Sequence, residues 1–147
     1  MDILLKIVRS NELLEIRSKV LRNNTSHENC KFNGDNKKSS VHIGAYRNDQ
    51  IVGGISIIKN NCNYKKLKNC YQLRGMCVLD NFQNNGIGNK ILNEAEKQCK
   101  NLDINNIWMN ARIKAAPFYL KSNYIDLGIR YEIKGIGLHS CLYKELK

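Results

Sequence analysis

Apolar and polar positions change their spacing along this chain, and those changes predict its elements. An apolar run over 3–9 predicts a first strand. After Ser10, which can cap a helix, apolar side chains recur every three or four residues as far as Leu21, and this spacing predicts an amphipathic helix. Two β-rich runs, 41–46 and 51–59, flank a short polar turn and predict a hairpin.

The second half of the chain continues with further predicted elements. In chain order these are a strand at 71–79, a helix opened by Gly86, a short buried strand at 104–109, a helix at 112–121 and a strand around 138–143. Pro117 falls inside the second of these helix patterns, so we expect a kink or a late helix start there. The order β-α-β-β-β-α-β-α-β predicts one α/β domain, residues 1–147, around a mixed sheet.

Two polar stretches, 23–40 and 60–69, separate these elements. Long loops in compact domains are usually functional or mobile, and we expect this of the first stretch. A hydrophobic content of 42% is ordinary for a globular domain. No apolar run approaches the roughly 20 residues that cross a bilayer, and residues 1–9 lack the features of a secretion signal. We therefore expect a cytoplasmic protein without a membrane partner.

The cysteines do not indicate a metal site. They are Cys30, Cys62, Cys70, Cys77, Cys99 and Cys141. No CxxC pair and no Cys/His cluster with zinc spacing occurs among them, so we expect no metal. Two of them fall within predicted apolar faces, where a free cysteine behaves as a small hydrophobe. We expect all of them to be reduced and structural.

The formal net charge of +11 is enough to attract polyanions, so nucleic acid has to be considered as a partner. However, the basic residues are scattered, and their densest cluster is Lys65, Lys66 and Lys68. The chain has one Trp and no basic stripe interleaved with aromatic residues, which disfavours nucleic acid. Either the charge is only a solvated surface, or it favours an anionic cofactor or substrate.

The junction of the 71–79 strand with the next helix predicts an anion site. A polar loop follows the strand, and Gly86 and Gly88 begin the helix. The N–H groups at a helix N-terminus are unpaired and carry the positive end of the helix dipole. Glycine lets the main chain approach a phosphate closely because it has no Cβ. The predicted site is therefore built mainly from backbone.

Two nucleotide-binding motifs do not fit this loop. A Rossmann motif needs glycine at position 91, and a Walker motif needs Lys directly after Gly88. The spacing of Gln83, Gly86 and Gly88 instead resembles the Q/R-x-x-G-x-G pyrophosphate signature of the GCN5-related N-acetyltransferases (GNAT). The resemblance implies acetyl-CoA as the acyl donor, with its pyrophosphate held by Gln83, Asn84, Asn85, Gly86, Ile87, Gly88 and Asn89.

The strand before the loop extends the resemblance. Residues 72–78 look like the fourth strand of that family, where a bulge splays two parallel strands. The resemblance implies the GNAT fold, a mixed central sheet with a splayed parallel pair flanked by helices. It also implies that the main chains of Met76 and Val78 bind the pantetheine arm. Gly75 is well placed for the bulge, because an isolated glycine in a strand often marks one.

Downstream, residues 116–124 resemble the family's A-x-F-Y-x-K-x-G-F segment. The resemblance identifies Tyr119 as the acid that protonates the departing thiolate. A phenol, with an ordinary pKa near ~10, is protonated at neutral pH and can still donate. The alternative is a core tyrosine packed beside Phe118. Asn123 replaces a usual glycine but tolerates the left-handed conformation, whereas Arg112 replaces a usual asparagine, so that position's contacts do not carry over.

The attacking amine must be neutral, so a general base is required. The candidates are His139, Glu132 and His42, with His139 preferred because an imidazole titrates near neutrality. A structural role for His139 is the alternative. Arg22, Arg74 and His42 are candidates to bind the acceptor, because arginine pairs well with carboxylate or phosphate. Each arginine could equally be a surface ion-pair partner.

The resemblance implies an N-acetyltransferase that transfers acetyl directly to a primary amine in a ternary complex. The acceptor candidates are a small anionic amine such as glucosamine 6-phosphate, a polyamine, an amino acid or a protein N-terminus. The alternative functions are a catalytically inactive CoA-binding module and a basic nucleic-acid-binding protein. Homodimers are common among enzymes of this family, but the sequence shows no interface.

Overall fold

The computed structural model describes residues 2–64 and 69–146. In that part of the chain the strands are β1 Leu4–Val8, β2 Val41–Arg47, β3 Gln50–Lys59, β4 Cys70–Val78, β5 Asn106–Arg112, β6 Ile125–Ile133 and β7 Gly137–Glu145. The α-helices are α1 Leu14–Leu21, α2 Ile87–Asn101 and α3 Ala116–Leu120. The basic cluster of Lys65, Lys66 and Lys68 lies outside the described residues.

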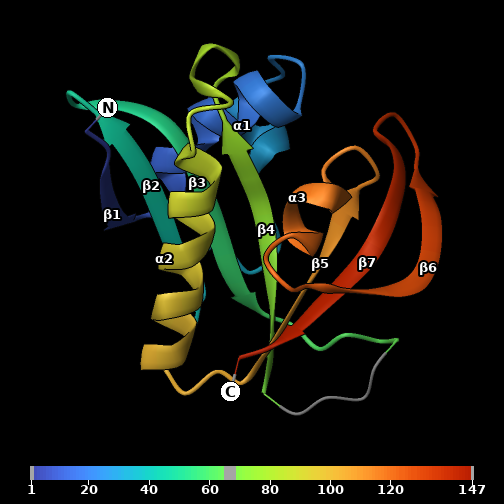
Figure 1. Cartoon of the computed structure of the whole chain (residues 1–147). Helices are drawn as coiled ribbons and strands as arrows, with labels where there is room; N and C mark the ends of the chain where they lie inside the picture. Colours follow the sequence, from blue (N-terminus) through green and yellow to red (C-terminus); the bar gives the residue numbers. More distant parts are fainter. Residues whose placement is uncertain (1, 65–68, 147) are drawn as a thin grey trace.

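One mixed sheet organises the domain, with the strand order β1-β2-β3-β4-β5-β7-β6. The pairs are antiparallel except β4 and β5, which are parallel. That parallel pairing extends only from Cys70–Asn106 to Gln72–Trp108. Beyond it β4 and β5 diverge, as Figure 1 shows. This confirms the predicted mixed sheet with a splayed parallel pair.

A bulge in β4 accompanies the divergence. Gly54 of β3 faces Cys77, whereas Ser56, two residues later, faces Arg74, so β4 contains one more residue than β3 over this stretch. Gly75 lies in the bulge with φ +68°, a conformation that glycine adopts without strain. The bulge predicted at Gly75 is therefore confirmed.

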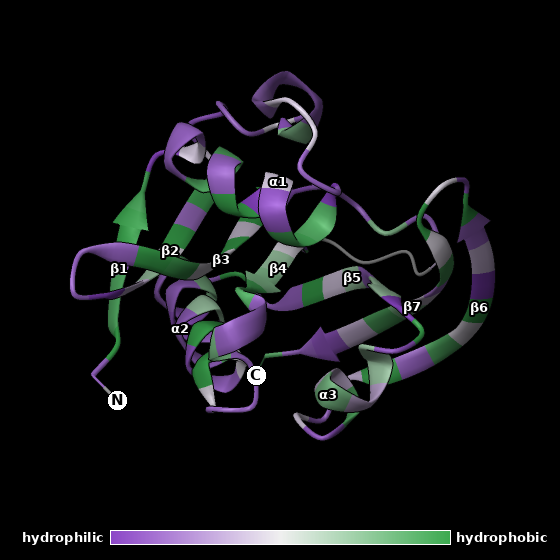
Figure 2. Ribbon diagram, turned by 90° about the horizontal axis from the view of Figure 1, so that it is seen from above, coloured by the Kyte–Doolittle hydropathy of each residue, from purple (hydrophilic) through white to green (hydrophobic). Residues whose placement is uncertain are grey.

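Helices cover both faces of the sheet. Seen from above, α1 lies on one face, and α2 and α3 lie on the other (Figure 2). The pair Gly53 and Gly54 lets helices approach closely on both faces. A Cβ on Gly53 would come within 2.7 Å of Ile91 in α2, and one on Gly54 within 2.7 Å of Leu13 before α1. Sequence periodicity predicted both helices but not this requirement for small residues.

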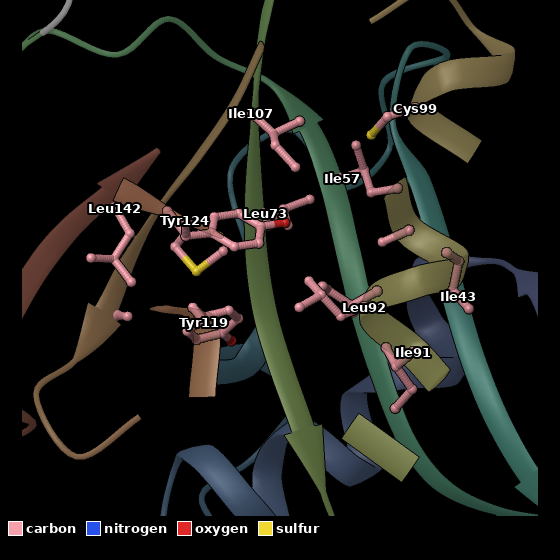
Figure 3. Packing of buried hydrophobic residues seen from close by; sticks show 14 of the residues in the cluster. Ile43, Ile57, Leu73, Ile91, Leu92, Cys99, Ile107, Tyr119, Tyr124 and Leu142 are labelled. Carbon is pink, nitrogen blue, oxygen red and sulfur yellow. The ribbon is translucent and has the colours of Figure 1, made fainter. Parts of the chain in front are cut away.

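The main core lies between the sheet and α2. Ile91, Leu92 and Cys99 project from α2 into the cluster that also contains Tyr119 (Figure 3). All six cysteines are free and buried, as expected. Burial raises the pKa of Cys77 and of Cys99 to about 12, so these thiols stay protonated and act as apolar groups. No helix in the described part of the chain is long and apolar enough to span a membrane.

The first helix and strand β6 differ from the sequence prediction. Ser10 does not cap α1, because residues 10–13 form a 3-10 turn and α1 begins only at Leu14. The helix expected at 112–121 begins only at Ala116, with Pro117 in its first turn, so the expected late start is confirmed. Strand β6 was not predicted. Its residues are exposed or half-buried throughout, and its pairing with β7 is interrupted between Asp126 and Arg130. An edge strand with such a break lacks the buried alternation that identifies strands.

Candidate active site

The divergence of β4 and β5 opens a cleft of about 790 Å³. Its walls are residues 72–78 of β4 and 109–112 from β5. The loop before α2 and the start of that helix close one end, and α3 contributes Phe118 and Tyr119. Arg22, Phe32 and His139 line the remaining side. The cleft thus joins segments that are far apart in the sequence.

The N-terminus of α2 points unpaired amides at this cleft. The capping residue is Gly86, with φ +78°, and no side chain caps the helix. The Lys90 N–H donates to Gly86 O at 3.2 Å, so the amides of 87–89 precede the first helical hydrogen bond. The first turn holds no acidic residue. A Cβ on Gly86 would meet nothing within 4 Å, and residues 86–89 all line the cleft. The arrangement fits a phosphate group.

Side chains of the loop hold its shape. The Gln83 amide donates to Val78 O at 3.0 Å and to Asp80 Oδ1 at 3.3 Å. The Asn85 amide donates to Phe82 O at 3.3 Å and to Gln83 O at 3.2 Å. Of the predicted pyrophosphate residues, Asn85 alone does not line the cleft. Gln83 and Asn85 therefore use their side chains to order the loop.

Strand β4 presents an open edge to the cleft. Its pairing with β5 ends at Gln72, and both Met76 and Val78 line the space beyond that point. An extended chain with amide groups can add to such an edge through main-chain hydrogen bonds. The edge leads directly toward the loop at 83–89, so one elongated ligand could contact both.

Tyr119 reaches the cleft from α3. Its ring packs edge-on against Phe118, with centroids 5.0 Å apart, and against Tyr124, at 5.8 Å. Among the described residues its hydroxyl has no hydrogen-bond partner, whereas the Tyr124 hydroxyl donates to Glu96 Oε2 at 2.8 Å. Burial, and to a smaller degree Cys77, raises the pKa of Tyr119. The phenol is therefore protonated and able to donate.

His139 lines the cleft from β7, opposite Arg112 of β5. Its Nδ1 lies 2.8 Å from Gly137 O. A carbonyl oxygen only accepts, so Nδ1 carries a proton, and Nε2 is the ring nitrogen that could take one from a substrate. The ring stacks on Tyr131 with centroids 5.9 Å apart. This orientation suits a general base.

The structure does not bring the other two base candidates into the cleft. Glu132 is exposed on β6, and it is not a lining residue. His42 is buried, with Nδ1 2.7 Å from Ser56 Oγ and Nε2 2.8 Å from Asp35 O. Burial lowers the pKa of His42. His42 is thus part of a buried polar network, away from the cleft that an acceptor would enter.

Both predicted acceptor-binding arginines, Arg22 and Arg74, line the cleft. They are joined there by Arg112 and Phe32, which sequence reasoning did not assign to the site. Phe32 lies in the irregular stretch 23–40, where no periodicity identifies a side chain that turns inward. Among the described residues, no group of three or more His, Cys, Asp or Glu side chains could hold a metal ion.

Comparison with known proteins identifies the family. Residues 15–140 match the model of the acetyltransferase (GNAT) domain. The chain is 28% identical over 142 residues to the uncharacterised N-acetyltransferase YitI of Bacillus subtilis (strain 168), covering 97% of this chain and 95% of that protein.

Solved structures show the same fold. Escherichia coli ElaA matches with a TM-score of 0.77 and 18% identity over 98% of this chain and all of that one. An aminoglycoside 6'-N-acetyltransferase complexed with coenzyme A matches with a TM-score of 0.75 and 16% identity, covering 98% and 97% of the two chains. Because the domain match spans most of its length, this chain belongs to the GNAT family of acetyltransferases.

Proposed function

We propose that this acetyltransferase uses acetyl-CoA and transfers the acetyl group directly to a primary amine bound in the same cleft. The observation that carries the proposal is one continuous cleft with unpaired amides of 87–89 at one end and the unengaged Tyr119 hydroxyl within it. The related enzyme that was solved with coenzyme A has the same fold, which supports this choice of donor.

The residues of the cleft fit this donor. The amides that open α2 would hold the pyrophosphate, and the free edge at Met76 and Val78 would hold the pantetheine arm. Gly88 is also under steric constraint, because an added Cβ would come within 3.2 Å of the Phe118 ring. Larger side chains at Gly88 would therefore require Phe118, which also lines the cleft, to shift.

In the proposed reaction the protein accepts one proton, donates another and stabilises the negative charge of the oxyanion. His139 Nε2 takes the proton of the attacking amine, directly or through water. The main-chain N–H of Met76 donates to the oxyanion as the new C–N bond forms. Tyr119 donates its phenolic proton to the thiolate as the C–S bond breaks. The products are an amide and a free thiol, so thiol release reports turnover.

The experiment that tests this function is thiol release from acetyl-CoA across a panel of amines. The panel includes glucosamine 6-phosphate, polyamines, amino acids and peptides with free N-termini. We expect amine-dependent thiol release with at least one class and calorimetric binding of acetyl-CoA. Binding without release on any amine would favour the inactive CoA-binding module. No binding at millimolar acetyl-CoA would contradict both.

A further inference from the structure

Three guanidinium groups converge in the part of the cleft away from the phosphate loop. Arg22 directly follows the C-terminus of α1, Arg74 precedes the β4 bulge and Arg112 ends β5. All three line the cleft. They come from three separate elements, so the cluster is created by the fold and is not visible as a sequence run.

Shared contacts link the three groups. Arg22 Nη1 and Arg112 Nη2 both donate to the Leu21 carbonyl oxygen, at 3.2 Å and 3.1 Å. Arg22 and Arg74 share the ring of Phe32, with their guanidinium carbons 5.8 Å and 4.3 Å from its centroid. The guanidinium groups therefore gather around one carbonyl and one aromatic ring.

No carboxylate forms an ion pair with these three arginines within residues 2–64 and 69–146. None of the ion pairs there includes Arg22, Arg74 or Arg112. Asp80 is the one acidic residue that lines the cleft, and it accepts from Gln83 in the phosphate loop. The buried carboxylate of Asp35 is already paired with Arg17, at 2.7 Å.

The cluster is electrostatically unfavourable as it stands. Burial lowers the pKa of Arg74 and the neighbouring charges of Arg22 and Arg17 lower it further, and these effects outweigh the opposing effects of Asp35 and Tyr131. Burial likewise lowers the pKa of Arg22, with Arg112 as the next largest cause. Partly buried like charges favour the neutral form of each group unless an anion compensates them. Among the described residues these guanidinium groups donate only to the Leu21 carbonyl, and their remaining donors match carboxylate and phosphate oxygens.

The cluster rests on a rigid support. The Phe32 N–H donates to Asp35 Oδ2 at 2.9 Å, and that carboxylate is fixed by two hydrogen bonds from Arg17. Arg17 also stacks on the Phe32 ring, 3.8 Å from its centroid. The ring that contacts Arg22 and Arg74 is thus held from the buried side. Such support preorganises a binding site.

We propose that Arg22, Arg74 and Arg112 form a subsite for an anionic oxygen group, a phosphate monoester or a carboxylate, carried by the amine acceptor. The inference rests on the proposed acetyl transfer in this cleft. Arg74 is separated by only Gly75 from Met76, whose N–H the proposed mechanism places at the reacting carbonyl, so the anion would bind close to the reacting centre. The acceptor class is therefore a small amine with a nearby negative charge.

Matched pairs of amines test the subsite. Glucosamine 6-phosphate is compared with glucosamine, O-phosphoethanolamine with ethanolamine, and 4-aminobutyrate with butylamine. We expect kcat/KM to be at least about 10-fold higher for the anionic member of the preferred pair, as charge-assisted hydrogen bonds provide. The phosphate and carboxylate pairs show which group is preferred. Equal kcat/KM values within every pair would overturn the proposal.

Arginine variants test whether the cluster causes the higher kcat/KM for anionic amines. In R74Q and R112Q the ratio of kcat/KM for the anionic amine to kcat/KM for its neutral partner should fall by about 10-fold. The KM for acetyl-CoA should stay unchanged. R74K should retain part of the preference. The matched control is R47Q, which removes the same charge at an exposed position outside the cleft and should leave the preference unchanged. An unaltered preference in both R74Q and R112Q would refute the assignment.

A binding measurement separates failure of the subsite from failure of the proposed function. If no amine supports thiol release, inorganic phosphate is titrated calorimetrically into protein saturated with coenzyme A, so that the phosphate loop is filled. Binding that is lost in R74Q and R112Q but kept in R47Q supports the subsite even without turnover. Equal binding in all proteins, or none in the wild type, contradicts it.

Discussion

Single residues acquire their roles from what surrounds them, as Tyr119 and Tyr124 show. Both are buried, their rings touch, and burial raises the pKa of each. The Tyr124 hydroxyl donates a hydrogen bond to Glu96, which also accepts from Lys144 at 2.9 Å, so Tyr124 is a structural group. Tyr119 has no partner among the described residues and faces the cleft. Resemblance to the family's segment at 116–124 pointed to Tyr119, and the packing is what distinguishes it from its neighbour.

Replacing Tyr119 with phenylalanine should lower kcat by about 100-fold or more, because a positioned general acid contributes ~10²–10⁴-fold. The KM for acetyl-CoA should change little, since the ring and its packing remain. Steady-state thiol release measures both quantities. Tyr46→Phe is the control, because Tyr46 lies on β2 outside the cleft and should keep full activity. An equally active Tyr119→Phe enzyme would remove Tyr119 from the mechanism.

The predictability of the site also varies from residue to residue. The loop glycines follow from local sequence and Tyr119 from the family resemblance, and Asn123 has the left-handed φ of +71° expected where that family segment usually has glycine. Phe32 and Arg112 could not be assigned, because their place in the cleft depends on how separate elements pack. The same limitation explains why His42 looked like a site residue, although its partners Ser56 and Asp35 bury it elsewhere.

Whole elements were predicted where one periodicity continued over many residues. The strands of the β2–β3 hairpin are nearly continuous buried runs, and α2 has an unbroken apolar face, and both match the prediction closely. Strand β6 was missed because it lies at the sheet edge and contains Gly128 at φ +77° within the break in its pairing. The sequence pattern therefore predicts a helix or strand only where its residues are buried in a regular order.

The conformation of the α2 cap leads to a prediction for the Gly86→Ala variant. Gly86 has φ +78°, so alanine should cost ~1–2 kcal/mol of stability and disturb the amides that follow. We expect the KM for acetyl-CoA to rise by about 10-fold, which corresponds to ~1.4 kcal/mol. Kinetics and urea unfolding measure the two effects.

Gly135→Ala provides the matched control for that variant. Gly135 has φ +82° with open space around it, and it does not line the cleft. Its replacement should cost similar stability without changing the KM for acetyl-CoA. If Gly86→Ala and Gly135→Ala raise this KM equally, the loop has no specific role in holding the donor.

At the scale of the whole molecule, one buried network ties the helical layer to the sheet. Arg17 of α1 donates to Asp35 in the loop before β2 and to Ser56 Oγ of β3, at 2.8 Å. Burial alone would raise the pKa of Asp35, but hydrogen bonds from Arg17 and the Phe32 N–H hold it below the usual value. These partners are distant in sequence, so local pattern could not predict the network.

Asp35→Asn should reduce the free energy of unfolding by ~3–5 kcal/mol, because it leaves the buried charge of Arg17 unpaired. The lowered folded-state pKa of Asp35 means that its contribution is present above the unfolded value of ~3.9 and lost as pH falls through the folded value. The wild type should therefore lose this stabilisation in acid, whereas the variant should not show that loss. Urea unfolding across pH measures it.

Asp126→Asn is the comparison for the Asp35 variant. Asp126 also pairs with an arginine, Arg130, at 2.8 Å, but both side chains are accessible to solvent. Removing this pair should cost at most ~1 kcal/mol. If both variants lost the same free energy of unfolding, the buried Arg17–Asp35 pair would contribute no more to stability than an exposed pair.

The central claim is that main-chain donors at the start of α2 hold the donor's pyrophosphate and direct its thioester along β4 toward Tyr119. A crystal structure of the protein with acetyl-CoA tests this most directly. We predict phosphate oxygens within hydrogen-bonding distance of the amides of 86–89, pantetheine amides paired with Met76 and Val78, and the sulfur beside the Tyr119 hydroxyl. Acetyl-CoA bound outside this cleft would contradict the account.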